Sequence, residues 1–183
     1  MVAVDVGSHI GLWSYMMAHD FSEIHAFEPV ADHQGCWREN MRGVNAILHL
    51  HSLALGEKEQ TVYIHRRTPG SSGDTGVDPH AWRSTLWASV DSEGERVQMR
   101  TLDSFELPRV DFLKADCEGY ELFVLRGGRE TLLRCKPICI IEQKPSTGGA
   151  ERYGIGVTDG VVFLESLGAK RRGDTGGDYI LSW

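Results

Sequence analysis

The sequence predicts an α/β fold, with a doubly wound and mostly parallel sheet, in a single domain that spans residues 1–183. Short apolar runs rich in β-branched residues alternate with segments of helical character, which is the pattern of such a sheet. One of these runs, at 137–142, is apolar throughout its interior, as expected of a central parallel strand. A length of 183 residues corresponds to roughly one domain and allows a core without disulfides.

The first third of the chain predicts strand, helix, strand, helix and strand in that order. Gly7 ends the first strand, and Pro29 stops the second because proline cannot donate a ladder hydrogen bond. This order is typical of parallel strands joined by crossover helices. The predicted strands are 2–6, 24–29 and 46–54, and the predicted helices are 11–18 and 31–42.

The middle of the chain is less regular. It predicts strands at 61–64 and 96–100, separated by a Gly- and Ser-rich stretch at 66–85 that has no periodicity. A loop longer than ~12–15 residues is usually functional or disordered, so we expect 66–85 to be a substrate or lid loop. Trp82 in this stretch and Trp87 just after it could offer flat faces to a sugar, although core or lid packing is the commoner role of tryptophan.

The α/β alternation resumes in the last third of the chain. A strand at 110–116 precedes a helix at 119–134 that is interrupted at Gly127 and Gly128. After the apolar strand at 137–142 comes a second Gly-rich loop, and Gly168 is a typical residue to end the last helix. The remaining predicted segments are a loop at 147–156, a helix at 157–167, and an antiparallel hairpin at 169–172 and 179–183.

Charge and composition restrict the partners. The chain carries 19 Lys and Arg against 26 Asp and Glu, a net charge of −7, so no nucleic-acid partner is expected. No apolar run approaches the ~20 residues that span a bilayer, and the start lacks the basic region of a signal peptide, so we expect no membrane association. The four cysteines form no C-x-x-C pair and are expected to be buried thiols in a reducing cytoplasm.

The turn after the first strand has the character of a cofactor loop. In the segment from Asp5 through Gly7 and His9 to Gly11, a strand leads into glycines that open a helix, which allows a ligand to approach backbone N–H groups. Glu28 lies 17 residues beyond Gly11, where an acid can accept hydrogen bonds from both hydroxyls of a ribose. The glycines alone indicate only an ordinary turn, but with this acid they predict a nucleotide-type cofactor.

The residue types in this loop favour one cofactor over another. His9 stands where a dinucleotide-binding loop has a glycine that packs on the pyrophosphate. A bulky residue is better tolerated by a cofactor without pyrophosphate, such as S-adenosyl-L-methionine. The chain also lacks a tyrosine followed four residues later by lysine, the acid–base pair of short-chain dehydrogenases. A dehydrogenase therefore remains the last alternative.

The order of motifs along the chain is more specific. The segments are VDVGSHIGLWSY, HAFEP, SLALGE, RTLDSF, VDFLKADCEGYELFVLRGG and PICIIE. In this order the chain resembles the FkbM family of S-adenosylmethionine-dependent methyltransferases over nearly its whole length. The block with D-x-E-G-x-E and V-L-R-G-G is the most specific part, and His9 stands where the family commonly has asparagine.

The resemblance implies a Rossmann-like class I methyltransferase fold with a reversed strand at the sheet edge. It also implies methyl transfer, typically to a hydroxyl oxygen, with S-adenosyl-L-homocysteine as the product. Asp5, Gly7 and Gly11 would then surround the amino-acid part of the cofactor, Glu28 would hold the ribose, and the segment after the third strand would lie beside the adenine. The full expected cofactor-binding set is Asp5, Gly7, Ser8, His9, Gly11, Glu28, Pro29, Ser52, Leu53, Ala54 and Asp116.

Three carboxylates are the predicted catalytic residues: Asp116, Glu118 and Glu142. Asp116 and Glu142 end two neighbouring parallel strands at the edge where open α/β sheets bind ligands. Converging acids raise one another's pKa and can give a general base near neutral pH, or they can hold a hard divalent cation such as Mg²⁺. The alternatives are an acid of the helix N-terminus for Glu118 or Glu121, and pairing with Lys144 for Glu142.

Other candidates rank lower. His49 and His51 would lie on one face of a strand as a possible metal pair, but the sequence shows no third ligand, so we expect structural or surface histidines. His25 is expected to be structural, and Cys117 to be a packing residue.

The leading hypothesis is a methyltransferase that acts on a hydroxyl of a small molecule or glycan. The alternatives are a non-catalytic domain that binds S-adenosylmethionine or a nucleotide and, less favoured because of the net charge of −7, an RNA ribose methyltransferase.

Overall fold

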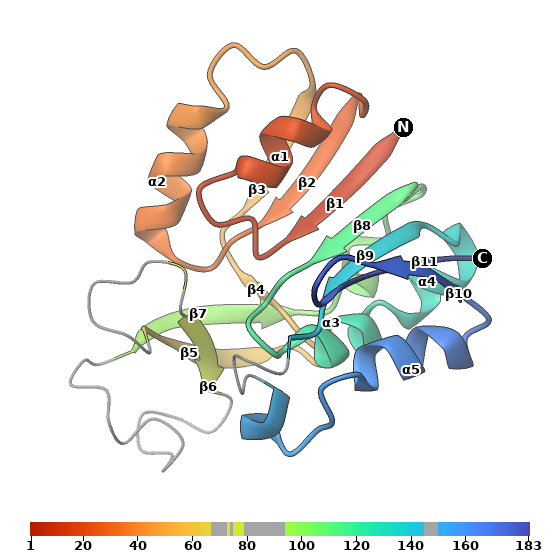
Figure 1. Ribbon diagram of the computed structural model, residues 1–183. Helices are drawn as coiled ribbons and strands as arrows, with labels where there is room; N and C mark the ends of the chain where they lie inside the picture. The colour runs from red at the N-terminus through yellow and green to blue at the C-terminus, as the bar shows by residue number, and fades with distance from the viewer. Residues whose placement is uncertain (67–72, 74, 79–93, 145–149) are drawn as a thin grey trace.

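The computed structural model describes residues 1–66, 73, 75–78, 94–144 and 150–183. Within these ranges the strands form two sheets (Figure 1). The larger has seven strands in the order β10-β11-β9-β8-β1-β2-β3, and the smaller has four in the order β4-β7-β5-β6. No helix in these ranges is both long and apolar enough to cross a bilayer.

The larger sheet confirms the predicted α/β architecture. Five of its strands run parallel, with β1 paired to β2 on one side and to β8 on the other. These parallel strands are β1 (Val2–Val6), β2 (Glu23–Phe27), β3 (Ile47–His51), β8 (Phe112–Ala115) and β9 (Ile138–Glu142).

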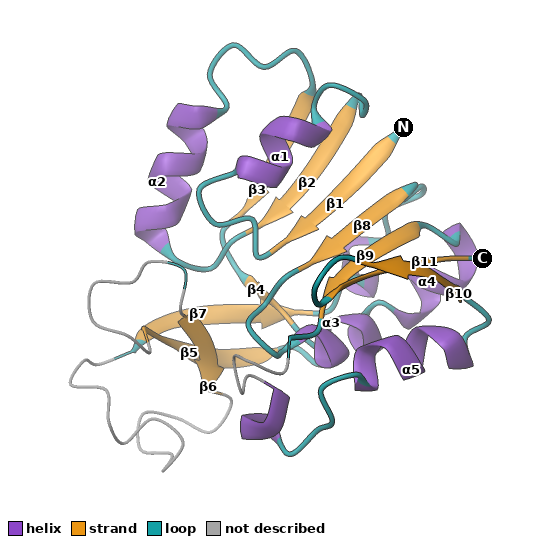
Figure 2. Cartoon of the chain, viewed as in Figure 1, coloured by secondary structure: helices purple, strands orange, loops and turns teal. Residues whose placement is uncertain are grey.

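Helices cover both faces of this sheet (Figure 2). Along β1, Ala3 packs with Met17 of α1, whereas Val4 belongs to the cluster that contains Leu132 of α4. Because successive side chains of a strand point to opposite faces, the sheet is doubly wound. The helices are α1 (Leu12–Met17), α2 (Ala31–Asn40), α3 (Glu121–Gly127), α4 (Arg129–Cys135) and α5 (Asp159–Ser166).

The predicted C-terminal hairpin is present at one edge of the sheet. It consists of β10 (Lys170–Asp174) and β11 (Asp178–Ser182). The reversed strand is β11, which pairs antiparallel with β9, and β10 lies outside it as the outermost strand.

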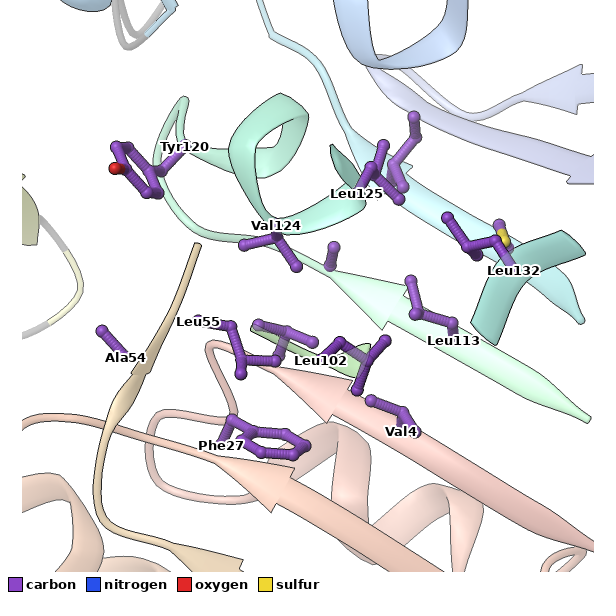
Figure 3. Packing of buried hydrophobic residues seen from close by; sticks show 14 of the residues in the cluster. Val4, Phe27, Ala54, Leu55, Leu102, Leu113, Tyr120, Val124, Leu125 and Leu132 are labelled. Carbon is purple, nitrogen blue, oxygen red and sulfur yellow. The ribbon is translucent and has the colours of Figure 1, made fainter. Parts of the chain in front are cut away.

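The core lies between the sheet and the helices of the second half of the chain (Figure 3). Leu132 is fully buried, and Leu102, Leu113 and Leu125 are each 1% exposed. Leu102 belongs to the segment that leads into the short helix η2 (Asp103–Phe105), so this connection is anchored in the core. Burial of side chains of this size stabilises the fold by about 1.5–3 kcal/mol each.

The predicted third strand, 46–54, is wrong in its last three residues. β3 ends at His51, where the N–H of Leu53 donates to the carbonyl oxygen of His51 at 3.0 Å and turns the chain away from the sheet. Ala54 and Leu55 then form β4, which pairs in parallel with the smaller sheet. β3 is the edge strand and has β2 as its neighbour, and β2 ends at Phe27 opposite His51, so no strand pairs with the chain beyond that point.

The expectation of an unstructured loop over 66–85 is wrong in part. Thr75–Asp78 forms β6, which pairs antiparallel with β5 (Gln60–Arg66). β7 (Glu95–Arg100) completes the smaller sheet on the other side of β5. A four-residue strand that contains one apolar side chain has too little pattern to be predicted. Trp82 and Trp87 lie outside the described residues, as do residues 145–149 of the second Gly-rich segment; Ala150–Tyr153 forms the 3₁₀ helix η4.

Gly127, at the end of α3, packs directly on another backbone segment. A Cβ at this position would lie 1.9 Å from the carbonyl oxygen of Gly56. This oxygen belongs to the backbone, so it cannot move aside as a flexible side chain could. We expect Gly127→Ala to lower the free energy of unfolding by about 1–3 kcal/mol, measured by urea denaturation. Gly35 in α2 is the control, because a Cβ added there would have nothing within 4 Å, and Gly35→Ala should stabilise the helix by about 1 kcal/mol. Equal effects of the two variants would contradict this packing argument.

Candidate functional site

A cavity of about 190 Å³ lies beyond the carboxyl ends of β1, β2 and β8 and extends to the smaller sheet. β1 is the point from which the strand order runs in both directions, and this is the usual ligand-binding place in an open α/β sheet. The predicted site residues that line the cavity are Gly7, His9, Glu28, Pro29, Leu53, Ala54, Asp116 and Glu118.

The loop after β1 is held close to its neighbours by backbone contacts. The N–H groups of Gly7 and Ser8 both donate to the carbonyl oxygen of Phe27, at 3.0 and 3.2 Å. Gly7 has φ +73°, and a Cβ there would lie 2.0 Å from the carbonyl oxygen of Asp116. Glycine is therefore required for the ends of β1 and β8 to meet, and this contact forms the floor of the cavity.

Glu28 lies in the cavity wall and is 4% exposed. Its Oε2 accepts the N–H of His9 at 2.8 Å, and its Oε1 accepts the N–H of Val30 at 2.9 Å and contacts Nδ1 of His33 at 3.2 Å. These bonds hold the carboxylate in one orientation. A carboxylate oxygen can accept two hydrogen bonds, so Oε2 keeps capacity for a ligand hydroxyl.

His33 is a residue of this site that the sequence interpretation missed. Its ring lines the cavity beside the ring of His9, with centroids 4.3 Å apart. His33 is 4% exposed, and its Nε2 has no hydrogen-bond partner among the described residues. Its position in the first turn of the predicted helix could have placed it near Glu28, because helical side chains lean back toward the N-terminus.

The opposite wall is apolar and comes largely from the smaller sheet. Leu53 and Ala54 lie there as expected, and the sequence did not indicate that Ile64 of β5 and Val77 of β6 would join them. Ser52 does not line the cavity; its hydroxyl donates to Oε1 of Gln34 at 2.8 Å. The combination of an apolar wall and a fixed carboxylate is typical of a small-molecule site.

Asp5, Ser8 and Gly11 do not line the cavity either. Asp5 is fully buried beneath α1, where its Oδ2 accepts the hydroxyl of Ser14 at 2.6 Å. Burial raises the pKa of Asp5, and the Lys114 ammonium opposes that shift. Asp5 therefore bonds to α1 through Ser14 and interacts with the charge of Lys114, but it does not line the cavity.

Asp116 and Glu142 meet as predicted at the ends of β8 and β9. Their carboxyl groups are hydrogen-bonded to each other, and one oxygen of each lies within 4.8 Å of an oxygen of Glu118. Burial, followed by the hydrogen bond and charge of Asp116, raises the pKa of Glu142 to about 7. Burial is also the largest effect on Asp116 and acts to raise its pKa. The charges of Lys114 and Lys144 and the hydrogen bonds with Lys114 and Glu142 together outweigh burial, so the pKa of Asp116 is lowered. The two acids therefore differ in protonation near neutral pH.

Two lysines compensate the charge of this carboxyl pair. Nζ of Lys114 lies 3.0 Å from Oδ2 of Asp116, and Lys144 bonds Oε1 of Glu142, so the alternative partner considered for Glu142 is also present. A divalent cation at these acids would compete with both ammonium groups. The arrangement favours proton transfer over cation binding.

Glu121 occupies the first position of α3, as the helix alternative requires. Its Oε1 accepts the N–H groups of Cys117 and Gly119 at 2.7 and 3.1 Å, and these bonds shape the turn that carries Asp116 and Glu118. Burial raises the pKa of Glu121 to about 7 and that of the Cys117 thiol well above its usual value. A neutral thiol is consistent with a packing role for Cys117, which is half-buried and lines the cavity. The expectation of four buried thiols is wrong, because Cys139 is buried, Cys117 and Cys135 are half-buried, and Cys36 is exposed.

The raised pKa of Glu121 predicts a pH-dependent stability. Because the folded chain holds this proton up to about pH 7 and the unfolded chain loses it near 4.5, the free energy of unfolding should fall between these values, by at most about 3 kcal/mol. Glu121→Gln should reduce this decline, because glutamine does not titrate. Denaturant melts at pH 5 and pH 8 would measure the difference, and an unchanged decline in the variant would contradict the assignment.

Comparisons with known proteins agree with this architecture. A family model described as the methyltransferase FkbM domain matches residues 5–170. The crystal structure of methyltransferase FkbM from Methylobacillus flagellatus KT superposes with a TM-score of 0.65 at 16% identity, over 99% of this chain and 43% of that one. A TehB-like SAM-dependent methyltransferase from Corynebacterium glutamicum gives a TM-score of 0.44 at 8% identity, over 99% of this chain and 77% of that one. The chain thus spans less than half the length of the first neighbour, and no curated protein matches it.

Proposed function

Because the chain belongs to the FkbM methyltransferase family, we propose that it transfers a methyl group from S-adenosyl-L-methionine to a hydroxyl oxygen of a small molecule or glycan. The observation that carries this proposal is the cavity itself. It joins a fixed acid at the end of β2, Glu28, to Asp116 at the end of β8. Glu142, the partner of Asp116 at the end of β9, does not line the cavity itself.

The residues of the cavity fit the nucleoside part of this cofactor. Oε2 of Glu28 would accept a hydrogen bond from a ribose hydroxyl, and the apolar wall with Leu53 and Ile64 would pack on the adenine ring. The buried Nε2 of His33, which lacks a protein partner in the described ranges, fits a polar group of the ligand. At about 190 Å³ the cavity is smaller than the roughly 300–1,000 Å³ of sites that enclose a whole ligand, so it would receive the adenosine portion.

When bound, S-adenosylmethionine supplies a methyl group on a sulfonium, which is transferred by in-line displacement. The protein must align the acceptor hydroxyl and remove its proton. Asp116 lines the cavity and would accept the hydrogen bond of that hydroxyl. The proton would then be held by the Asp116–Glu142 pair, whose Glu142 has a pKa of about 7 and is therefore a suitable base near neutral pH.

A small molecule or glycan with a free hydroxyl is the acceptor class that we propose. The net charge of −7 disfavours a nucleic-acid backbone, and no helix of the described ranges spans a membrane. We also propose that the protein works in the cytoplasm, because this compartment supplies the cofactor and keeps free thiols such as these four reduced.

Titration calorimetry with S-adenosylmethionine and with S-adenosylhomocysteine tests the proposal. We expect both compounds to bind one site per chain, and a donor labelled in its methyl group to label small hydroxylated acceptors. Absence of binding at millimolar concentration would contradict the proposal. Binding without any labelled product would instead support the non-catalytic cofactor-binding domain.

A further inference from the structure

A group of polar side chains lies on β2 and β3, away from the cavity. Glu23, His25, His49 and His51 share one face of these two strands, and the parallel register places His25 directly beside His49. The alternating residues of the same strands, Ala26 and Leu50 among them, pack with α2 on the other face. The four polar side chains therefore form a separate histidine cluster on the face opposite α2.

Three atoms of the histidine cluster converge on one point. Oε1 of Glu23 lies 3.2 Å from Nε2 of His25 and 3.1 Å from Nε2 of His49. In tetrahedral coordination with bonds of 2.0–2.1 Å, neighbouring ligand atoms are roughly 3.3 Å apart. The imidazoles are stacked with centroids 4.4 Å apart, so both Nε2 atoms face the same carboxylate. Two of the three separations match this value, and one ligand atom from each of the three residues lies within 4.8 Å of those of the other two.

His51 holds the His25 ring in this orientation. Its Nε2 lies 3.1 Å from Nδ1 of His25, and its own ring is fixed between Phe27 at 4.5 Å and Phe105 at 4.8 Å. With the proton of His25 on Nδ1 and donated to His51, the lone pair of Nε2 is available to a metal ion. Metal-bound histidines are commonly oriented by such a second hydrogen bond.

Burial and charge also favour a cation here. The side chain of His25 is 10% exposed, and the Glu23 carboxylate beside it supplies a negative charge. The side chain of His49 is 41% exposed, so the point of convergence can be reached from solvent.

We propose that Glu23, His25 and His49 bind a divalent first-row transition-metal ion, of which Zn²⁺ is the best match. Two imidazoles and one carboxylate suit Zn²⁺, whereas Mg²⁺ and Ca²⁺ prefer oxygen ligands alone. Three protein ligands leave the fourth position to water. The ion would join the edge strand β3 to β2, whose ends carry Leu53 and Glu28 into the cavity. This assignment does not depend on the methyltransferase proposal.

Calorimetric titration of the full chain with Zn²⁺ tests the site. We expect one Zn²⁺ per chain, a rise in melting temperature on binding, and at least about a tenfold loss of affinity in His49→Gln and in Glu23→Gln. Visible absorption of Co²⁺ in place of Zn²⁺ should show tetrahedral coordination in the wild type and change in both variants. Mg²⁺ should not compete.

His19→Gln is the matched control, because His19 is exposed and lies on the segment after α1, outside the histidine cluster. It should bind Zn²⁺ as the wild type does, and the melting temperatures of all variants without metal show whether they fold. Undiminished Zn²⁺ binding by folded His49→Gln and Glu23→Gln, or no binding by the wild type, would overturn the proposal.

Discussion

Glu28→Gln is expected to weaken the binding of S-adenosylmethionine by about 10- to 100-fold. A hydrogen bond to a charged group contributes about 1.5–3 kcal/mol, and Oε2 of Glu28 has capacity for one such bond from the ribose. Each 1.4 kcal/mol corresponds to a factor of ten in the dissociation constant. The loss should appear in the affinity and leave the number of sites at one.

Glutamine has a size similar to that of Glu28, but it cannot accept all the hydrogen bonds that the Glu28 carboxylate accepts in the cavity wall. Both oxygens of Glu28 already accept hydrogen bonds, Oε2 from the N–H of His9 and Oε1 from the N–H of Val30. The amide group of glutamine would direct its own donors against one of these N–H groups. The variant therefore disturbs the loop after β1 as well as the ribose contact.

Calorimetry with S-adenosylhomocysteine measures this effect, and Glu39→Gln is its control. Glu39 lies on α2 with an exposed side chain that pairs with Arg42, so the same change of residue there should leave the affinity unaltered. A thermal melt shows whether each variant is folded. A folded Glu28→Gln variant with wild-type affinity would remove Glu28 from the cofactor site.

Local sequence patterns predicted most of the larger sheet because β1, β8 and β9 are short runs of mostly apolar residues. β1 and β9 could be placed within one or two residues, and the acids at strand ends followed from the rule that parallel strands present their carboxyl ends to one edge. The meeting of Asp116 with Glu142 could be predicted for this reason, since it needs only the order of two neighbouring strands.

Contacts between distant segments could not be predicted in the same way. The smaller sheet depends on pairing β5 with β7 and β4 with β7, and no local period encodes which strands pair. The apolar wall of the cavity and the separation of β4 from β3 follow from that pairing. Only part of the histidine cluster could be predicted, because His49 and His51 alternate along one strand. Glu23 and His25 join them only through the register of β2 with β3.

Asp116→Asn should retain cofactor binding and lose turnover by a factor of about 10²–10⁴, the usual contribution of general acid–base catalysis. Asp116 faces the cavity, is bonded to Glu142 and is paired with Lys114. Asparagine preserves its shape but can neither carry the negative charge nor share the transferred proton. Loss of cofactor binding together with turnover would instead assign Asp116 to the cofactor and remove it from the catalytic role.

The pH dependence of turnover separates the roles of the two acids. A base acts when it is deprotonated, so wild-type activity should rise with pH through about 7, the pKa of Glu142. Asp116 raises that pKa through its hydrogen bond and charge, so in Asp116→Asn the rising limb of the residual activity should move to lower pH. Glu142→Gln should abolish the limb, because the titrating group is gone.

The exposed Asp20 gives the control Asp20→Asn, which should keep both the turnover and the pH profile of the wild type. Rates would be measured with labelled methyl donor at saturating acceptor between pH 5 and pH 9. An unshifted limb in Asp116→Asn would mean that the two carboxyls do not titrate as a pair. A limb that persists in Glu142→Gln would place the base elsewhere, with Glu118 as the remaining acid of the cavity wall. The three profiles together therefore identify which carboxyl receives the proton, because a coupled pair predicts a shift in one variant and a loss in the other.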